Sequence, residues 1–339
     1  MVLRSYTRAA TFGYQDFFRR SCPANNHLRS CDIHWRLRTR PIHSSSAMDH
    51  SVSLENTSAS REAWNRQLSN EKPMTVLEGR EWLRQSMQPE ALRIAGVTFE
   101  GRQELIAKLQ PDQALMLQKD SSNEYDPNAI KVMTLSGSVL GFVPRELTGR
   151  FPYDTTFGHA YHIGQVPDKG MWGALVAVRP QLPPLTVDAF PDSLVSQSNL
   201  SSILPESDWD KLSQATLRAA NYRCEISAGQ GSDRAAPVVC QEVWSFDDEE
   251  GVVKLEGLQA LCPEVHLAKH VLVQADDKQR QTAMWTLQAM NEWSIMEAEE
   301  YLQYLRRLIQ QRNKIQWRLD LSWLQSRGIE LPNDIRGGA

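Results

Sequence analysis

Short apolar runs, separated by turn residues at close intervals, constrain the fold of this chain more than any other sequence feature. Between residues 91 and 184 the runs are RIAGVTFE, ALMLQKD, AIKVMTL, SVLGFV, YHIGQV and WGALVAV, each bounded by Gly, Pro, Asp or Asn. Runs of this length that are rich in Val, Ile, Leu and Phe are typical of β-strands. Five or six such strands at close spacing predict a small β-barrel or β-sandwich.

The remainder of the chain predicts a second unit with several helices. A chain of 339 residues is longer than one hydrophobic core usually serves. Helices are predicted from Ser207 as the N-cap, over 276–291, and from 295 to about 319. Ser294 and Glu297 have the spacing of a capping box at the start of the last helix. We therefore expect an α+β chain of two domains.

The expected segment boundaries follow these changes in pattern. They are a leader or disordered segment at 1–55, a helical lead-in at 56–90, the β-barrel at 91–186, a flexible linker at 187–206, and a second domain with C-terminal helices at 207–336. No window approaches the roughly 18 uninterrupted apolar residues of a membrane span, so no membrane partner is expected.

The first fifty residues differ in charge from the rest of the chain. They contain eight Arg, no Lys and three acidic residues, whereas the whole chain has a net charge of -4. Aromatic residues are interleaved with the arginines, and the segment lacks the central apolar run of a secretory signal. This composition predicts a transit peptide for a mitochondrion or chloroplast. The alternative is a disordered tail with translation from Met48, which would leave the protein in the nucleus or cytoplasm.

Four blocks in the predicted barrel resemble the HIRAN domain family. They are GVTFEGR at 96–102, LMLQKD at 115–120, NEYDPNAI at 123–130 and GFVPREL at 141–147, in the order that the family shows. The resemblance implies a small OB-like β-barrel. One member of the family captures the 3′-hydroxyl end of single-stranded DNA, so the resemblance also implies a nucleic-acid partner.

The resemblance assigns roles to four residues. Asp126 would accept a hydrogen bond from the terminal hydroxyl, and Tyr125 would line the pocket for the strand end. Phe99 would offer a face for base stacking, and Arg145 would bind phosphate. The alternative interpretation of NEYDPNAIKV is a tight turn that enters a strand, with local hydrogen bonds from its Asn and Asp side chains.

Two departures from the end-binding relative weaken the expected contacts. Thr98 stands where that relative has a basic residue, and Phe142 stands where it has His. The segment also carries about as many acidic as basic residues, whereas a surface that follows a nucleic-acid backbone needs clustered positive charge. We therefore expect capture of strand ends without tight non-specific binding. The alternative that the barrel is purely structural and does not bind DNA is also compatible with the sequence, since a fold does not fix a function.

The stretch from Tyr222 to His270 resembles the HNH, or ββα-metal, nuclease family. In this family four Cys or His ligands hold a structural zinc, and a His activates the attacking water. By the resemblance, Cys224 and Cys262 stand at two of the four zinc positions. His266 and His270 lie one helical turn apart on a predicted helix, so both could bind one metal ion. These four residues are the candidate metal ligands, and zinc is the candidate metal, although the cofactor is not identified by the sequence.

The same stretch lacks residues that the chemistry of this family needs. Ser227 and Val265 stand where the other two zinc ligands belong, and Gln241 replaces the catalytic His. An amide nitrogen cannot act as a general base, which favours a non-catalytic domain. Glu242 is retained beside it. The alternative to a metal site is a structural one, with small buried cysteines and a pair of histidines on one helix face.

The function we predict is non-catalytic binding of single-stranded DNA 3′ ends in organellar DNA repair or maintenance, with the second domain as a docking or scaffold surface. Three alternatives stay open: an active metal-dependent nuclease of the HNH type, a protein-docking adaptor without DNA affinity, and a reader of RNA ends. The acidic chain after the leader is compatible with a protein partner. The sequence does not separate DNA from RNA or identify the organelle.

Overall fold

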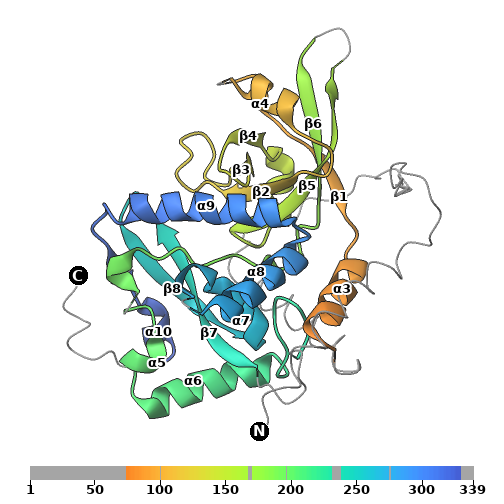
Figure 1. Cartoon of the computed structure of the whole chain (residues 1–339). Coiled ribbons are helices and arrows are strands. Elements are labelled where there is room, and N and C mark those ends of the chain that lie inside the picture. Colours follow the sequence, from red (N-terminus) through yellow and green to blue (C-terminus); the bar gives the residue numbers. More distant parts are fainter. Residues whose placement is uncertain are drawn as a thin grey trace, which may run out of the picture. The chain divides into compact units, whose positions relative to one another are not determined.

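The predicted strands between residues 91 and 184 form one curled antiparallel sheet (Figure 1). The computed structural model describes residues 74–99, 101–166, 170–195, 197–230, 238–274 and 276–329. The sheet consists of β1 (Glu90–Arg93), β2 (Ala114–Lys119), β3 (Ile130–Thr134), β4 (Val139–Phe142), β5 (Thr155–Gln165) and β6 (Trp172–Val178), in the order β1-β6-β5-β2-β3-β4. The predicted α+β class is confirmed, with this curled sheet, called the barrel below, in the expected place.

The two edges of the sheet meet at a single bridge. Ala95, just beyond β1, exchanges two backbone hydrogen bonds of 2.8 and 3.0 Å with Phe142 at the end of β4. Gly141 lies at this crossing, where an added Cβ atom would overlap the carbonyl oxygen of Ala95. Any other residue would push the edges apart, so the close approach requires glycine.

The second half of the described chain contains a β-hairpin and a group of helices. The strands are β7 (Val239–Asp247), β8 (Val252–Leu261) and β9 (Arg318–Asp320), which pairs in parallel with β8. The helices are α5 (Leu200–Ile203), α6 (Glu206–Ala219), α7 (Pro263–Lys269), α8 (Asp277–Asn291), α9 (Ile295–Arg312) and α10 (Ser322–Ser326). The order β7-β8-α7 is strand, strand, helix, but this order alone does not establish an HNH module.

The starts of two helices test the predicted caps, and a third helix has a cap that the sequence analysis did not predict. Ser294 caps α9, and the side chain of Glu297 reaches back to its backbone, as the capping box predicts. Helix α6 begins at Glu206 after Pro205, so Ser207 lies inside the first turn and is not the N-cap that we expected. In the lead-in, α3 (Val76–Ser86) begins with a second capping box that starts at Thr75.

One hydrophobic core joins the barrel to the second half of the chain. Strand β2 reads ALML and is buried on both faces, because Leu115 and Leu117 face the interior of the barrel while Ala114 and Met116 join the second core. A continuous apolar run of this kind is typical of a strand covered on both sides. Helices α7, α8 and α9, with the turn between the last two, supply much of this core, including Val265, Leu287, Met290, Trp293, Tyr301, Leu302 and Leu305.

The segment from residue 187 to 206 differs from the flexible linker that we expected. Val187 and Ala189 are buried in the shared core, and Leu200 and Leu204 are buried in a cluster with α10. Asp188 between them donates its backbone N–H to the carbonyl of Lys269 at 2.9 Å. The linker prediction is therefore wrong for the described residues of this segment. The apolar residues of this segment alternate with polar ones but do not form the pattern of a regular strand. The periodicity of the sequence therefore did not indicate that they are buried.

None of the helices within the described ranges combines the length and the apolar character that crossing a bilayer requires. The predicted leader at residues 1–55 lies outside the described residues.

Candidate nucleic-acid interface

The loop between β2 and β3 carries the two residues to which the sequence gives the central roles. Asp126 Oδ2 lies 3.2 Å from Nε of Arg145, and Asp126 Oδ1 accepts the backbone N–H of Asn128 at 2.9 Å. The side chain of Asp126 is 16% exposed and that of Arg145 is 80% exposed. Arg145 begins the 3-10 helix η1 (Arg145–Arg150) directly after β4. The structure thus brings together a carboxylate and a guanidinium on a side chain that is largely open to solvent.

Two large aromatic side chains lie exposed on the barrel. Tyr125 is 90% exposed, next to Asp126 in the same loop, and Phe99 is 64% exposed. Phe99 belongs to a different loop, which leaves β1 and is joined to the strand before Arg145 by the Ala95 bridge. Exposed aromatic rings provide stacking faces for bases. Both rings are thus open to solvent, and the stacking role of Phe99 and the pocket-lining role of Tyr125 stay predictions.

The tight-turn interpretation of the loop also agrees with the structure. Asn123 Oδ1 accepts the backbone N–H groups of Tyr125 and Asp126, each at 3.1 Å. Sequence reasoning did not single out Asp120, whose carboxylate lies 2.9 Å from Nζ of Lys131 and also binds Asn123. The sequence signal that could have indicated Asp120 is its position three residues before Asn123, the residue that makes the Asx turn.

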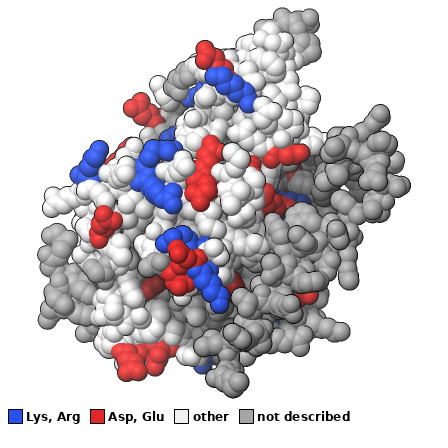
Figure 2. All heavy atoms as spheres, in the orientation of Figure 1, with Lys and Arg blue, Asp and Glu red and all other residues white. Residues whose placement is uncertain are grey.

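Charge on the visible face of the molecule is mixed. Figure 2 shows Lys and Arg side chains interspersed with Asp and Glu, without a continuous basic stripe. Several bases are already paired, as Lys119 is with Asp154 at 3.2 Å and Arg150 is with Glu90 at 2.6 Å. This distribution suits a few local phosphate contacts and not a long backbone track.

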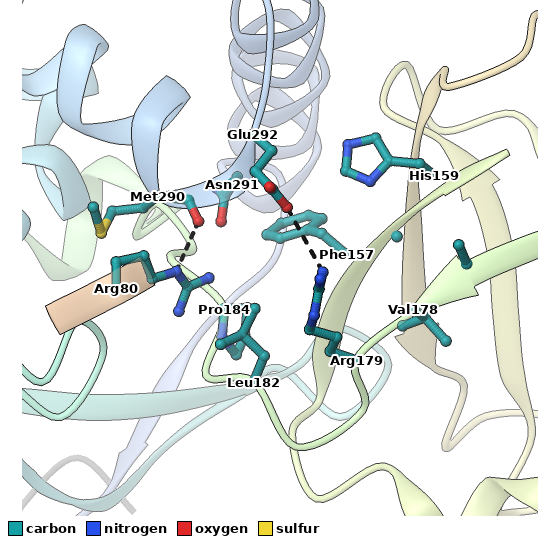
Figure 3. A pocket seen from close by; sticks show the side chains of 12 residues that line it. Arg80, Phe157, His159, Val178, Arg179, Leu182, Pro184, Met290, Asn291 and Glu292 are labelled. Carbon is teal, nitrogen blue, oxygen red and sulfur yellow. Dashed lines mark hydrogen bonds and ion pairs between the residues drawn. The ribbon is translucent and has the colours of Figure 1, made fainter. Parts of the chain in front are cut away.

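A pocket at the junction of the barrel and α8 is too small to hold a nucleotide (Figure 3). Its cavity volume is about 30 Å³, which is room for roughly two water molecules. Arg80 donates to the carbonyls of Met290, Pro183 and Ile226, and Glu292 lies 3.9 Å from Arg179. These arginine contacts join the two halves of the chain, so the pocket serves the architecture.

The two candidate zinc-binding cysteines are buried neighbours. Cys224 is 1% exposed and Cys262 is 0% exposed, and Ser227 Oγ lies 3.7 Å from the Cys262 Sγ. Burial alone would raise the pKa of Cys224, but hydrogen bonds from Cys262 and Ser227 outweigh it and lower that pKa. Val265 is fully buried in the same core. The four positions that the resemblance assigns to zinc therefore lie in one place, with donors at only two of them that bind zinc well.

The two candidate histidines form a separate set. Their rings lie 4.8 Å apart, and His270 Nε2 lies 3.2 Å from Oε1 of Gln241. Nδ1 of His270 lies 3.9 Å from Asp188, which forms a 2.8 Å ion pair with the buried Lys269. Burial lowers the pKa of His266 to about 4, and it lowers the pKa of His270 as well. Both rings are thus neutral near pH 7 and have protein neighbours.

The predicted metal ligands do not assemble into one site. Across the residues that the structure describes, no three His, Cys, Asp or Glu side chains come together as a metal ion requires. Cys224 and Cys262 lie with Ser227, whereas His266 and His270 lie with Gln241. The donor set does not fit zinc, because a hydroxyl and an isopropyl group replace two ligands. Glu242 is buried and accepts the backbone N–H of Leu200 at 2.8 Å, so it is also engaged.

Comparisons with known proteins match only part of the chain. The family model of the HIRAN domain matches residues 92–152, and no curated protein matches the chain. Among solved structures, a protein from Lactobacillus plantarum shows 22% identity over 27% of this chain and 93% of its own, with a TM-score of 0.22. The HIRAN domain of human HLTF shows 20% identity over 28% of this chain and 78% of its own, with a TM-score of 0.20. The segment that matches the HIRAN family model, residues 92–152, contains Asp126 and Arg145.

Proposed function

We propose that this protein binds nucleic acid through its HIRAN domain and that the ligand is the 3′ end of single-stranded DNA. The observation that carries the proposal is the Asp126 and Arg145 pair of 3.2 Å beside the exposed Tyr125, inside the segment that matches the HIRAN model. A carboxylate accepts a hydrogen bond from a free hydroxyl and repels a terminal phosphate. The pair therefore suits recognition of a hydroxyl end.

Each of the four residues has a role in the proposed complex. Asp126 accepts the terminal hydroxyl, and the largely exposed side chain of Arg145 binds the last phosphodiester. Tyr125 and Phe99 stack on bases, which contributes about 1–3 kcal/mol per base without sequence preference. The mixed charge on the face that Figure 2 shows predicts moderate affinity and a shallow dependence on salt, since few phosphates are neutralised.

The second half of the chain has a non-catalytic role in this proposal. Gln241 cannot act as a general base, and its side-chain oxygen is within hydrogen-bonding distance of His270. The shared core that includes Met116 and Trp293 supports a scaffold role, because the helices cover one face of the barrel. We expect no metal-dependent cleavage of DNA by the purified chain. Metal-dependent cleavage by the wild type that a His266→Ala and His270→Ala double variant abolishes would contradict the assignment.

A role in the maintenance of organellar DNA belongs to the same proposal. Its support is the composition of the first fifty residues, with eight Arg and three acidic residues. We expect residues 1–55, fused to a fluorescent protein, to direct it into a mitochondrion or chloroplast. A fusion that stays in the cytoplasm or nucleus would overturn this part and leave end binding untouched.

The test of end binding is fluorescence anisotropy of the full chain with 5′-labelled single-stranded DNA that ends in a 3′-hydroxyl or a 3′-phosphate. We expect at least about tenfold tighter binding to the hydroxyl end, and loss of this preference in Asp126→Ala. Asp154→Asn is the matched control, because Asp154 forms an exposed ion pair of 3.2 Å on the same barrel. Equal binding of both ends, or no binding, would contradict the proposal. An RNA strand with the same sequence separates the two kinds of ligand.

A further inference from the structure

The loop that presents Tyr125 and Asp126 is held by a relay of hydrogen bonds that starts at a buried carboxylate. Asp120 is 7% exposed, and its Oδ1 lies 2.9 Å from Nζ of Lys131 on β3. Its Oδ2 accepts the side-chain amide of Asn123 at 3.2 Å. Asn123 Oδ1 in turn accepts the backbone N–H groups of Tyr125 and Asp126, both at 3.1 Å. The relay thus runs from the sheet to the two residues that face the ligand.

The carboxylate at the base of the relay is well suited to be a fixed acceptor. Burial alone would raise the pKa of Asp120, but hydrogen bonds from Lys131, Asn123 and Ser122 outweigh it and bring the pKa below its usual value. Its backbone N–H also donates to the carbonyl of Ala129 at 2.8 Å, which closes the loop on itself. Asp120 therefore stays charged at neutral pH and anchors both ends of the loop.

The side chain at position 123 must satisfy two opposite demands. It must present an acceptor to the two backbone N–H groups and a donor to the carboxylate of Asp120. The carboxamide of Asn123 has both an acceptor oxygen and a donor nitrogen. A carboxylate there would face another carboxylate, and an aliphatic side chain would leave all three partners without a bond.

We propose that Asp120 and Asn123 are positioning residues for the strand end and that they set its preference for a 3′-hydroxyl over a 3′-phosphate. They act through the backbone of Tyr125 and Asp126 and do not touch the strand themselves. This inference rests on the proposed function, since the preference exists only if the HIRAN domain binds strand ends. Its structural half, the ordering of the loop, can be measured without any ligand.

The decisive variants exchange the two side chains. In Asp120→Asn with Asn123→Asp together, the amide introduced at position 120 donates to the carboxylate introduced at position 123. The oxygen at position 120 still accepts from Lys131 and Ser122, and the oxygen at position 123 still accepts the two backbone N–H groups. Each single substitution instead places two donors or two acceptors against each other. The exchange therefore tests the hydrogen-bond pattern apart from the loss of either residue.

The experiment combines two measurements on the full chain. Amide hydrogen exchange of residues 120–129 reports the ordering of the loop, and anisotropy with hydroxyl-ended and phosphate-ended single-stranded DNA reports the preference. In Asn123→Ala and in each single exchange, we expect the amides of Tyr125 and Asp126 to exchange at least about tenfold faster and the end preference to fall below about twofold. In the double exchange we expect both values to return to within about threefold of the wild type.

Two results would overturn the inference. One is Asn123→Ala with the exchange rates and the end preference of the wild type. The other is a double exchange that is no better than the single exchanges. If the wild type shows no end preference, the proposed function fails, and hydrogen exchange still decides whether the relay positions the loop.

Discussion

Two regions of the molecule hold the polar side chains to which the sequence assigned a site. They are the barrel end, with Tyr125, Asp126 and Arg145, and the cysteine and histidine region, with Cys224, Cys262, His266 and His270. The two sets differ in their access to solvent. At the barrel end, Tyr125 is 90% exposed and the Arg145 side chain is 80% exposed. In the other region, Cys262 is fully buried, and Gln241 lies against His270. Groups that are buried with protein partners stabilise a fold, whereas groups held in place and open to solvent are available to a ligand. Residue types alone therefore do not identify a site.

The largest effect that we predict comes from the buried ion pair of the second region. Asp188→Ala leaves the buried Lys269 without its carboxylate at 2.8 Å and should lower the free energy of unfolding by about 3–5 kcal/mol. Chemical denaturation measures this change. Asp154→Asn, in an exposed pair, should cost at most about 1 kcal/mol. A loss below about 1 kcal/mol for Asp188→Ala would remove the distinction between the two regions.

Restoring the missing zinc ligands tests the region in the opposite direction. Ser227→Cys with Val265→Cys adds two thiols beside Cys224 and Cys262, which completes a set of four thiolates. Zinc at a hundred times its dissociation constant should then stabilise the variant by about 2.7 kcal/mol, with little effect on the wild type. Calorimetry with and without zinc measures this. Equal zinc binding by the wild type would show that the replaced ligands are not needed.

Removal of an exposed ring should affect binding and not stability. Tyr125→Ala should weaken binding of single-stranded DNA by about 1–3 kcal/mol, because the ring provides a stacking face for a base. Stability should change little, because the ring is 90% exposed and buries little surface in the folded protein. Anisotropy measures the affinity, and a melting curve checks the fold. Tyr222→Ala is the control, since Tyr222 is 50% exposed in the second half of the chain. Equal effects of both variants would contradict a specific role for Tyr125.

The joint between the two halves should have an intermediate effect. Glu297 Oε1 accepts the backbone N–H of Ala114 on β2, and Oε2 accepts the N–H of Ser294, both at 2.8 Å. Glu297→Ala should therefore lower the free energy of unfolding by about 1–2 kcal/mol. We expect the end preference to persist in the folded protein. Its loss would mean that the helices take part in shaping the barrel end.

The smallest effect on stability is expected for Arg145. Its ion pair with Asp126 is exposed on the arginine side, so Arg145→Ala should change the free energy of unfolding by less than about 1 kcal/mol. Affinity should fall for hydroxyl and phosphate ends alike. The slope of the logarithm of the binding constant against the logarithm of the salt concentration should become shallower by the amount that about one phosphate contact contributes. Titrations at three salt concentrations measure the slope. An unchanged slope would exclude a phosphate contact by Arg145.

The barrel could be predicted from the sequence because its signals are local. Short apolar runs, turn residues and the NEYDPNAI block lie close together in the chain, and the HIRAN model matches the same segment at 92–152. The capping box at Ser294 is likewise a local pattern and is present in the structure. The candidate contact residues Tyr125 and Asp126 came from a family resemblance, and their exposure and pairing came from the structure.

The union of the two halves could not be predicted, because its evidence is spread along the chain. The outward face of β2, with Met116, shares a core with helices about 150 or more residues away, and Val187 and Ala189 belong to the same core. The run ALML did indicate burial on both faces, but it did not indicate by which segment. Arg80, which joins α3 to α8, gave no signal in the sequence because a buried Arg needs partners that only the fold supplies.

The central claim is that the Asp126 and Arg145 pair makes the barrel end a receptor for a 3′-hydroxyl, and one measurement tests it most directly. It is the ratio of dissociation constants of the full chain for phosphate-ended and hydroxyl-ended single-stranded DNA, in the wild type and in Asp126→Ala. We predict a ratio of at least about ten that falls to about one in the variant. A ratio near one in the wild type, or an unchanged ratio in the variant, would contradict the claim.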